Sequence, residues 1–251
     1  MDAWGLFTAL AGPVVGSFVG LVSIRLPAGE AWIWGRSRCA SCERSLRVID
    51  LAPLLSYAIS QGRCRSCGAS IPWRYPVIEA GCLAIGVVSA LGQSGPAALA
   101  TALLGWWLML IALLDAEHFW LPDLLTIPLG LAGLALTIGA LGQPPLPQVI
   151  GAIVGYGALA LIAKVYEAVR GREGLGGGDP RLLGAIGAWV GWEALPSVLI
   201  WACAAGLSLV AAKLIARRRF DPAAALPFGV FLAIGAWLTW WTGPLHRLYA
   251  P

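Results

Sequence analysis

Two aspartates at the ends of apolar runs are the residues best suited to acid–base chemistry. Asp115 closes one such run, and Asp179 follows a run of glycines and precedes Pro180. Two carboxyl groups that share one proton can hydrolyse a peptide bond, because one activates water as a base and the other protonates the leaving amine. We therefore predict Asp115 and Asp179 as a catalytic pair, provided that the fold brings them together.

Each aspartate also has a structural interpretation. Asp115 could be an interfacial acid in water, although an acid at a helix C-terminus meets the negative end of the helix dipole. Asp179 followed by proline is typical of a helix start. The glycines before it admit the close backbone approach that an extended peptide substrate needs. We predict that substrate-approach segment as Gly176, Gly177 and Gly178.

Four cysteines form two Cys-x-x-Cys pairs, Cys39 with Cys42 and Cys64 with Cys67. This spacing is typical of a tetrahedral four-cysteine zinc site. The alternative is two disulfides, which a reducing cytosol disfavours. Four thiolates leave no open position for water, so we predict a structural zinc ion rather than a catalytic one.

Three further acids lie near apolar runs and are interpreted as structural. We expect Asp123 to cap the helix that it begins, and Asp50 to cap a short helix between the cysteine pairs. Glu79 lies in the first turns of an apolar helix, where the helix dipole favours an acid. Cys82 and Cys203 fall inside apolar runs and are interpreted as small apolar side chains.

The elements that must hold these residues are membrane helices. Of the 251 residues, 59% are hydrophobic and 12% are charged, against about 25% charged in a soluble domain. Several apolar runs approach the roughly 20 residues that cross a bilayer as a helix. We predict an all-α polytopic membrane protein with about eight transmembrane helices and no internal repeat, the helices at residues 5–24, 76–93, 97–115, 123–142, 147–167, 180–195, 197–216 and 227–243.

Basic residues predict the orientation. If the N-terminus is outside, all of the 17 lysines and arginines except Arg247 lie in or beside cytosolic segments. Outside the segment 25–75, the basic residues that lie in or beside cytosolic segments are Lys164, Arg170, Arg172, Arg181, Lys213 and Arg217 to Arg219. The net charge of +4 therefore reflects membrane topology and not nucleic-acid binding.

Three parts follow from this pattern: a first transmembrane helix at 1–24, a cytosolic zinc-binding segment at 25–75, and a transmembrane domain at 76–251. The cytosolic segment has roughly 50 residues, too few to bury much core unaided. We therefore expect the metal ion to hold it together.

With these features the chain resembles the bacterial type IV prepilin leader peptidases, which are also N-methyltransferases. They belong to the group of aspartyl peptidases marked by Gly-x-Gly-Asp. The resemblance covers nearly the whole chain. It rests on Gly16-Ser17-Phe18 through Pro27, both cysteine pairs, Asp50 to Tyr57, Arg74-Tyr75-Pro76 with Glu79, Leu114-Asp115 through Asp123, Gly174 to Asp179, and Pro227-Phe228-Gly229.

The resemblance implies two reactions at the cytosolic face of the bacterial inner membrane. The first removes the N-terminal leader of a type IV prepilin or pseudopilin, cutting after a glycine, with Asp115 and Asp179 as catalytic residues. The second methylates the new N-terminal amine from S-adenosylmethionine, and the segment 25–75 would carry it. The partners would be pilin precursors and membrane lipid.

The chain departs from the family pattern at two positions that bear on these activities. The family commonly has asparagine at the position of Gly20, which concerns methylation more than proteolysis, and lysine at the position of Arg181. Two alternatives stay open: a membrane methyltransferase without proteolysis, and a non-enzymatic membrane scaffold or transporter. A transporter would more naturally place acids at the bilayer midplane, whereas these acids gather near one predicted face.

Overall fold

A computed structural model describes residues 2–171, 174–216 and 226–248 of the chain. Arg172 and Arg217 to Arg219, four of the basic residues that predict the orientation, lie outside the described residues. The structure divides into two compact units, residues 1–110 and residues 111–251. Throughout the described part the regular structure is helical, apart from two isolated bridges between single residues, which confirms the all-α prediction.

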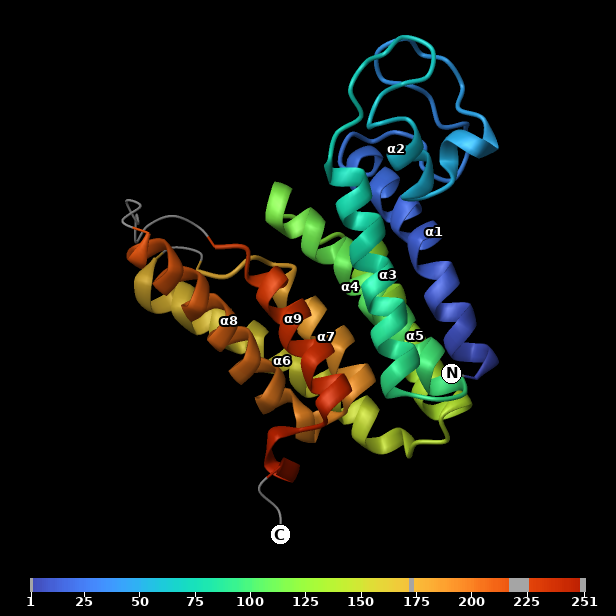
Figure 1. Ribbon diagram of the computed structural model, residues 1–251. Helices are drawn as coiled ribbons and strands as arrows, with labels where there is room; N and C mark the ends of the chain where they lie inside the picture. Colours follow the sequence, from blue (N-terminus) through green and yellow to red (C-terminus); the bar gives the residue numbers. More distant parts are fainter. Residues whose placement is uncertain (1, 172–173, 217–225, 249–251) are drawn as a thin grey trace. The chain divides into compact units, whose positions relative to one another are not determined.

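Helices are found at all eight predicted positions (Figure 1). Six helical stretches of the described chain are long and apolar enough to cross a membrane, whereas α7 has 12 residues and α9 has 15. The bounds are α1 Ala3–Arg25, α3 Arg74–Gly92, α4 Pro96–His118, α5 Asp123–Leu134 with the π-helix η2 Ala135–Ala140, α6 Pro145–Arg170, α7 Asp179–Val190, α8 Leu195–Ile215 and α9 Phe228–Thr242. The protein is therefore a polytopic membrane protein, and α7 and α9 are shorter than the predicted spans.

Unit 1 is built on the close pairing of α1 and α3. Glycines of α1 recur every four residues, and a Cβ on Gly12 or Gly16 would lie 2.6 Å from backbone atoms of α3. In return, a Cβ on Gly86 of α3 would lie 2.3 Å from the Thr8 carbonyl oxygen. Small residues at such spacing let two helix backbones approach closely. This close packing drives helix association in a membrane, where the hydrophobic effect does not.

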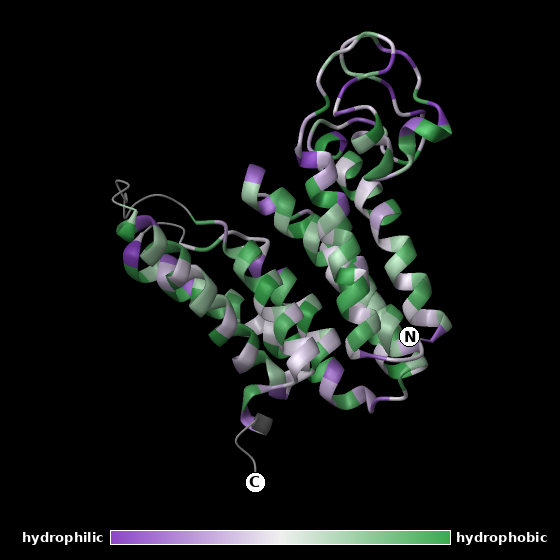
Figure 2. Cartoon of the chain, in the orientation of Figure 1, coloured by the Kyte–Doolittle hydropathy of each residue, from purple (hydrophilic) through white to green (hydrophobic). Residues whose placement is uncertain are grey.

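The segment between α1 and α3 holds the cysteines and has almost no core of its own. It contains only two short helices, η1 Val48–Leu51 and α2 Leu55–Ile59, and neither has a buried residue. Figure 1 shows this segment over the adjoining ends of α1 and α3, and Figure 2 shows that it gathers hydrophilic residues while the helices are mostly hydrophobic. The expectation that a metal ion holds this segment together agrees with its exposure.

Unit 2 is organised around α7, which packs against α5, α6 and α9. Ten of its residues, from Asp179 to Trp189, are buried. Its glycines meet those of α6, since a Cβ on Gly187 would lie 2.1 Å from the Gly151 carbonyl oxygen. The Trp189 indole donates a 2.9 Å hydrogen bond to the Leu129 carbonyl of α5. This short helix is therefore fixed inside the bundle by protein on several sides.

Candidate active site

The first predicted catalytic residue, Asp115, lies in the last turn of α4 and is 5% exposed. Its carboxylate accepts a 3.0 Å hydrogen bond from the backbone N–H of Val230 and a further one from that of Gly229. Both donors belong to the first turn of α9, whose opening N–H groups have no partner within their own helix. The positive end of that helix therefore faces Asp115 and stabilises a negative charge on it.

Gly229 permits this contact because it has no side chain. A Cβ at this position would lie 2.9 Å from the Asp115 Oδ2 atom and 3.1 Å from Leu121 Cδ1. The sequence motif Pro227-Phe228-Gly229 therefore marks a partner of Asp115. Nothing in the local sequence indicates that this motif lies beside Asp115.

The second predicted catalytic residue, Asp179, begins α7 and is 4% exposed. Its Oδ2 atom accepts a 3.1 Å hydrogen bond from the Gly176 N–H. Asp179 lies outside the six long apolar helices. Burial and the negative charge of Asp115 raise the pKa of its carboxyl group from 3.8 to about 6. The two predicted residues therefore lie in one unit and interact electrostatically.

Leu121 links the two aspartates sterically. This buried side chain lies against the position where a Cβ on Gly178 would sit, at 2.5 Å, and also against that of Gly229. The glycine before Asp179 and the glycine beside Asp115 thus pack on the same leucine. The end of α4, the start of α7 and the start of α9 meet here.

The three glycines before Asp179 differ in their surroundings. Gly176 provides the N–H that holds Asp179, and Gly178 makes room for Leu121. A Cβ on Gly177 would have nothing within 4 Å. None of the three has a positive φ. Within this chain two of them serve close contacts to the site itself, and the approach of a substrate stays a prediction.

Asp123 is not the helix cap that we expected. The residue before α5 is Pro122, and no side-chain capping bond is present. Instead the Asp123 carboxylate lies 2.7 Å from the Arg181 guanidinium, with both side chains about half exposed. This ion pair joins the first turns of α5 and α7 and has no signal in the local sequence.

The four cysteines of unit 1 come together as predicted. Their sulfur atoms all lie within 4.8 Å of one another, and Cys39 Sγ lies 3.8 Å from Cys67 Sγ. A tetrahedral ion with metal–sulfur bonds of about 2.3 Å separates its sulfurs by about 3.8 Å. All six described cysteines are free, so the disulfide alternative is not found. The cluster could therefore bind one metal ion.

The two cysteine pairs are halves of a repeat, contrary to the expectation that the chain has none. Residues 37–46 and 62–71 form the same turn, with Cys39 N–H bonded to the Arg44 carbonyl and Cys64 N–H to the Ala69 carbonyl. The two isolated bridges occupy equivalent positions, Arg38 with Ser45 and Arg63 with Ser70. The sequences Arg-Cys-Ala-Ser-Cys and Arg-Cys-Arg-Ser-Cys are the short sequence counterpart of this structural repeat.

Each turn stabilises the thiolate of its first cysteine. Backbone N–H groups of Cys67 and Ser66 lower the pKa of the Cys64 thiol to about 6. In the equivalent turn, the N–H groups of Cys42 and Ser41 lower the pKa of the Cys39 thiol. Because a thiolate is the form that binds metal, these two first cysteines are suited to bind a soft divalent cation.

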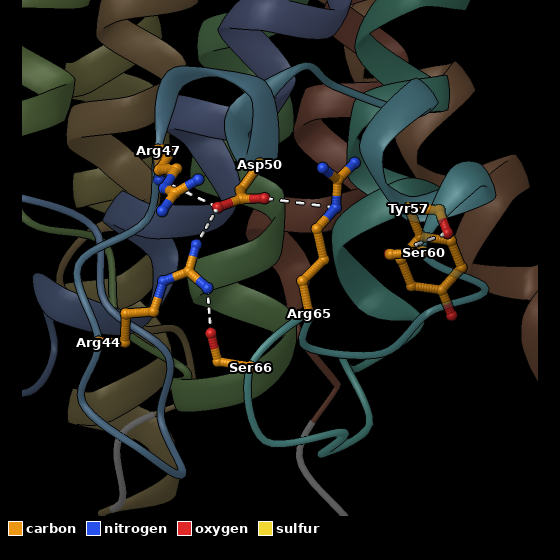
Figure 3. A network of polar contacts seen from close by, with 7 residues as sticks. All are labelled: Arg44, Arg47, Asp50, Tyr57, Ser60, Arg65 and Ser66. Carbon is orange, nitrogen blue, oxygen red and sulfur yellow. Dashed lines mark hydrogen bonds and ion pairs between the residues drawn. The ribbon is translucent and has the colours of Figure 1, made fainter.

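Asp50 connects the two halves of the repeat (Figure 3). Its carboxylate lies 3.0 Å from Arg44 of the first turn and 3.5 Å from Arg65 of the second, and it accepts the Arg47 N–H at 3.1 Å. Arg44 also donates to the Ser66 hydroxyl of the second turn. Asp50 does accept a backbone N–H at the start of η1, as a capping acid would, but its main contacts bridge the two cysteine turns.

The two units correspond to two known sequence families. Residues 10–92 match the Bacterial Peptidase A24 N-terminal domain, and residues 102–211 match the Type IV leader peptidase family. A membrane protein with two buried aspartates at its helix ends and a cysteine cluster thus falls in a class of membrane peptidases.

Curated relatives extend this match over nearly the whole chain. A prepilin leader peptidase/N-methyltransferase of Burkholderia pseudomallei is 39% identical over 96% of this chain and 87% of its own length. The proteins of the same name from Aeromonas salmonicida and Dickeya chrysanthemi are 38% and 35% identical, over 85% and 92% of this chain and 74% and 90% of their own lengths. No solved structure gives a significant match. The chain belongs to the prepilin leader peptidase/N-methyltransferase family, which favours the enzyme over the scaffold and transporter alternatives.

Proposed function

We propose that unit 2 cleaves the leader peptide of type IV prepilins or pseudopilins with Asp115 and Asp179. The observation that carries this proposal is that two buried carboxyl groups, each accepting hydrogen bonds from the backbone, interact electrostatically at the end of α4 and the start of α7. Buried acids in a membrane protein are costly and are retained where they have a function. The family's name gives the substrate class that such a pair would cut.

The surroundings of the two acids suggest different roles. Asp115 meets the N-terminus of α9, which stabilises a carboxylate, so Asp115 is the base that removes a proton from water. Asp179, whose pKa is about 6, holds the shared proton and donates it to the leaving amide nitrogen. The attack forms a tetrahedral intermediate, and its collapse breaks the peptide bond and leaves a new N-terminal amine.

The proposed site would face the cytosol at the inner membrane. The basic segments that predict this orientation border the same helix ends as the two aspartates. The apolar helix of a prepilin would then lie in lipid beside the enzyme, and its leader would stay at the surface where water is present. The three glycines before Asp179 would admit the extended backbone of the substrate.

We infer that unit 1 carries the second activity, transfer of a methyl group from S-adenosylmethionine to the new N-terminus. The relatives' names include N-methyltransferase, and the N-terminal family match covers α1, the cysteine segment and α3. The four cysteines would hold a structural zinc ion, because thiolate ligands at tetrahedral spacing suit zinc and leave no open position. The ion would replace the apolar core that this segment lacks.

Purified protein in detergent, given a synthetic prepilin peptide, tests the peptidase. Asp115→Asn and Asp179→Asn should each lower the cleavage rate by at least about 10²-fold. Mass spectrometry of the released leader measures that rate. Glu193→Gln, an exposed acid beyond the other end of α7, is the matched control and should cleave normally. Cleavage at the wild-type rate by either aspartate variant, with no loss of melting temperature, would remove that residue from the mechanism.

Metal analysis tests the zinc assignment separately. The purified chain should contain one zinc ion, Cys64→Ser should lose it, and Cys203→Ser, which changes an exposed cysteine of α8, should keep it. A protein that folds and retains both activities after complete metal removal would contradict a structural zinc ion.

A further inference from the structure

Unit 1 contains a cavity of about 370 Å³ between the ends of α1 and α3 and the cysteine segment. Its size falls within the range of small-molecule sites. Leu21 of α1 and the rings of Tyr57 and Tyr75 form part of its wall, and Glu79 of α3 contributes a carboxylate. Both cysteine turns also border it. The cavity is therefore lined by the same elements that the N-terminal family match covers.

Glu79 differs from the other acids of this wall. It is only 7% exposed, and its carboxylate accepts a 2.7 Å hydrogen bond from the Leu54 N–H and one from the Ser17 hydroxyl. Glu30 and Asp50 are engaged by arginines. Across the residues that the structure describes, no such cation is recorded against Glu79. A buried carboxylate with hydrogen-bond donors but no cation is suited to receive a cationic ligand.

The donor from the cysteine segment is held in a strained conformation. Leu54 has φ 61° and ψ −48°, and the Leu55 N–H bonds to the Pro53 carbonyl at 2.6 Å. This is a γ-turn with positive φ at its centre, which is rare for a residue with a side chain. Such strain persists where surrounding contacts impose it and gathers at functional sites. Here the contact with Glu79 points the Leu54 N–H at the cavity wall.

Close packing of α1 on α3 brings Ser17 to the same carboxylate. A Cβ on Gly16 would lie 2.6 Å from the Glu79 Cα, so only glycine lets α1 approach this part of α3. One turn further along, a Cβ on Gly20 would lie 3.3 Å from the Tyr75 ring. The Gly20 position therefore leaves room for the aromatic ring that lines the cavity.

We propose that this cavity is the site of methyl transfer and that Glu79 receives the α-ammonium group of the cleaved substrate. This inference rests on the proposed methyltransferase function of unit 1 and names its site. The fit of S-adenosylmethionine follows from three features: the cavity volume, a carboxylate that attracts cations, and tyrosine rings that attract a sulfonium. The same carboxylate can hold the amine against the methyl group.

The chemistry balances with Glu79 as the proton acceptor. The α-ammonium gives one proton to the Glu79 carboxylate, and the freed nitrogen lone pair attacks the methyl carbon of the sulfonium. The nitrogen–carbon bond forms while the carbon–sulfur bond breaks, and that electron pair neutralises the sulfur. The products are S-adenosylhomocysteine and a methylated ammonium, and Glu79 then returns its proton to water.

The test uses the full chain in detergent and a synthetic peptide that already begins at the cleaved N-terminus, so that methylation is measured without cleavage. We expect Glu79→Gln to lower methylation by at least 100-fold, read as the gain of a methyl group in the mass spectrum. Glutamine keeps an oxygen for the Leu54 N–H but cannot accept a proton. Binding of S-adenosylhomocysteine by calorimetry, the zinc content and cleavage of an intact prepilin peptide should stay near the wild-type values.

A second variant tests the cavity itself. Leu21→Trp fills it from α1 and should weaken S-adenosylhomocysteine binding at least tenfold while leaving cleavage intact. Glu167→Gln, an exposed acid of α6, is the control and should change neither binding nor methylation. Normal methylation by Glu79→Gln would overturn the role of Glu79, and normal binding by Leu21→Trp would overturn the site. Failure of the peptidase proposal is distinguishable, because it would change only the cleavage results. The wild type would then not cleave the prepilin peptide, or the Asp115 and Asp179 variants would cleave it.

Discussion

The Asp115 carboxylate accepts a hydrogen bond from the backbone N–H of Val230 at 3.0 Å, across 115 residues of sequence. The bond joins the last turn of α4 to the first turn of α9. It places an acid at the positive end of one helix and at the negative end of another. Since a carboxylate at its own helix C-terminus is disfavoured, the start of α9 supplies the compensation that lets a buried acid stay there.

Gly229→Ala should test this arrangement, because the added Cβ would lie 2.9 Å from the Asp115 Oδ2 atom. The carboxylate must then shift, and misplacement by about 1 Å can cost about 10²-fold in rate. We expect a loss of that order in peptide cleavage with little change in methylation. Gly157→Ala in α6, where a Cβ meets nothing within 4 Å, should cleave normally. Equal cleavage by the two variants would show that Asp115 does not need this contact.

Asp179→Asn should stabilise the protein above pH 6 while abolishing cleavage. Burial and the charge of Asp115 raise the pKa of Asp179 from 3.8 to about 6, so ionisation of this group opposes folding. The penalty is absent below pH 4, grows between pH 4 and 6, and is complete above pH 6. At about 1.4 kcal/mol for each pH unit, it reaches about 3 kcal/mol.

The measurement is the melting temperature of both proteins in detergent from pH 4 to 8. The wild type should lose stability relative to Asp179→Asn as pH rises through this window and stay at a constant difference beyond it. If the melting temperatures of the two proteins instead change in parallel across the whole pH range, ionisation of Asp179 does not destabilise the folded protein. Glu193→Gln again provides the comparison for an exposed acid.

Glu43→Gly should strengthen the cysteine cluster. Glu43 has φ 55°, whereas its equivalent in the second turn is Gly68 with φ 73°. A side chain in this left-handed region costs about 1 kcal/mol or more that glycine does not. We expect Glu43→Gly to lose its metal to a chelator more slowly than the wild type, and a zinc-binding dye measures the rate of loss. Glu43→Ala removes the same carboxylate but keeps the strain, so it should lose metal at the wild-type rate; a similar gain in both variants would attribute the effect to charge.

Asp50→Asn should weaken metal binding without touching a ligand. Asp50 joins Arg44 of the first cysteine turn to Arg65 of the second, and loss of such supporting contacts typically costs 10- to 100-fold in metal affinity. Competition with a chelator measures that affinity. Glu30→Gln, whose carboxylate lies 3.9 Å from Arg25 and is mostly exposed, is the control. An unchanged affinity in Asp50→Asn would show that the metal alone holds the two turns together.

The sequence by itself determined the membrane class, the positions of the helices and the residues that could do chemistry. Apolar runs, prolines, glycines and the Cys-x-x-Cys spacing are local features, and each acts within a few residues of where it is written. For this reason the eight helices were found where predicted, and the four cysteines cluster as their spacing indicates. The exposed turns around these cysteines also carried a short repeat that only their matching hydrogen bonds made evident.

Only the tertiary structure decided which of these residues meet. Asp115 finds its partners at Gly229 and Val230, and Asp123 pairs with Arg181 instead of capping its helix. Glu79 meets a strained turn of the cysteine segment and becomes part of a cavity wall. The length and hydropathy of a helix do not specify which face packs on which neighbour. That choice is made by close contacts between glycines and backbones far apart in the chain, so the polar contacts follow from packing and cannot be derived from the local pattern.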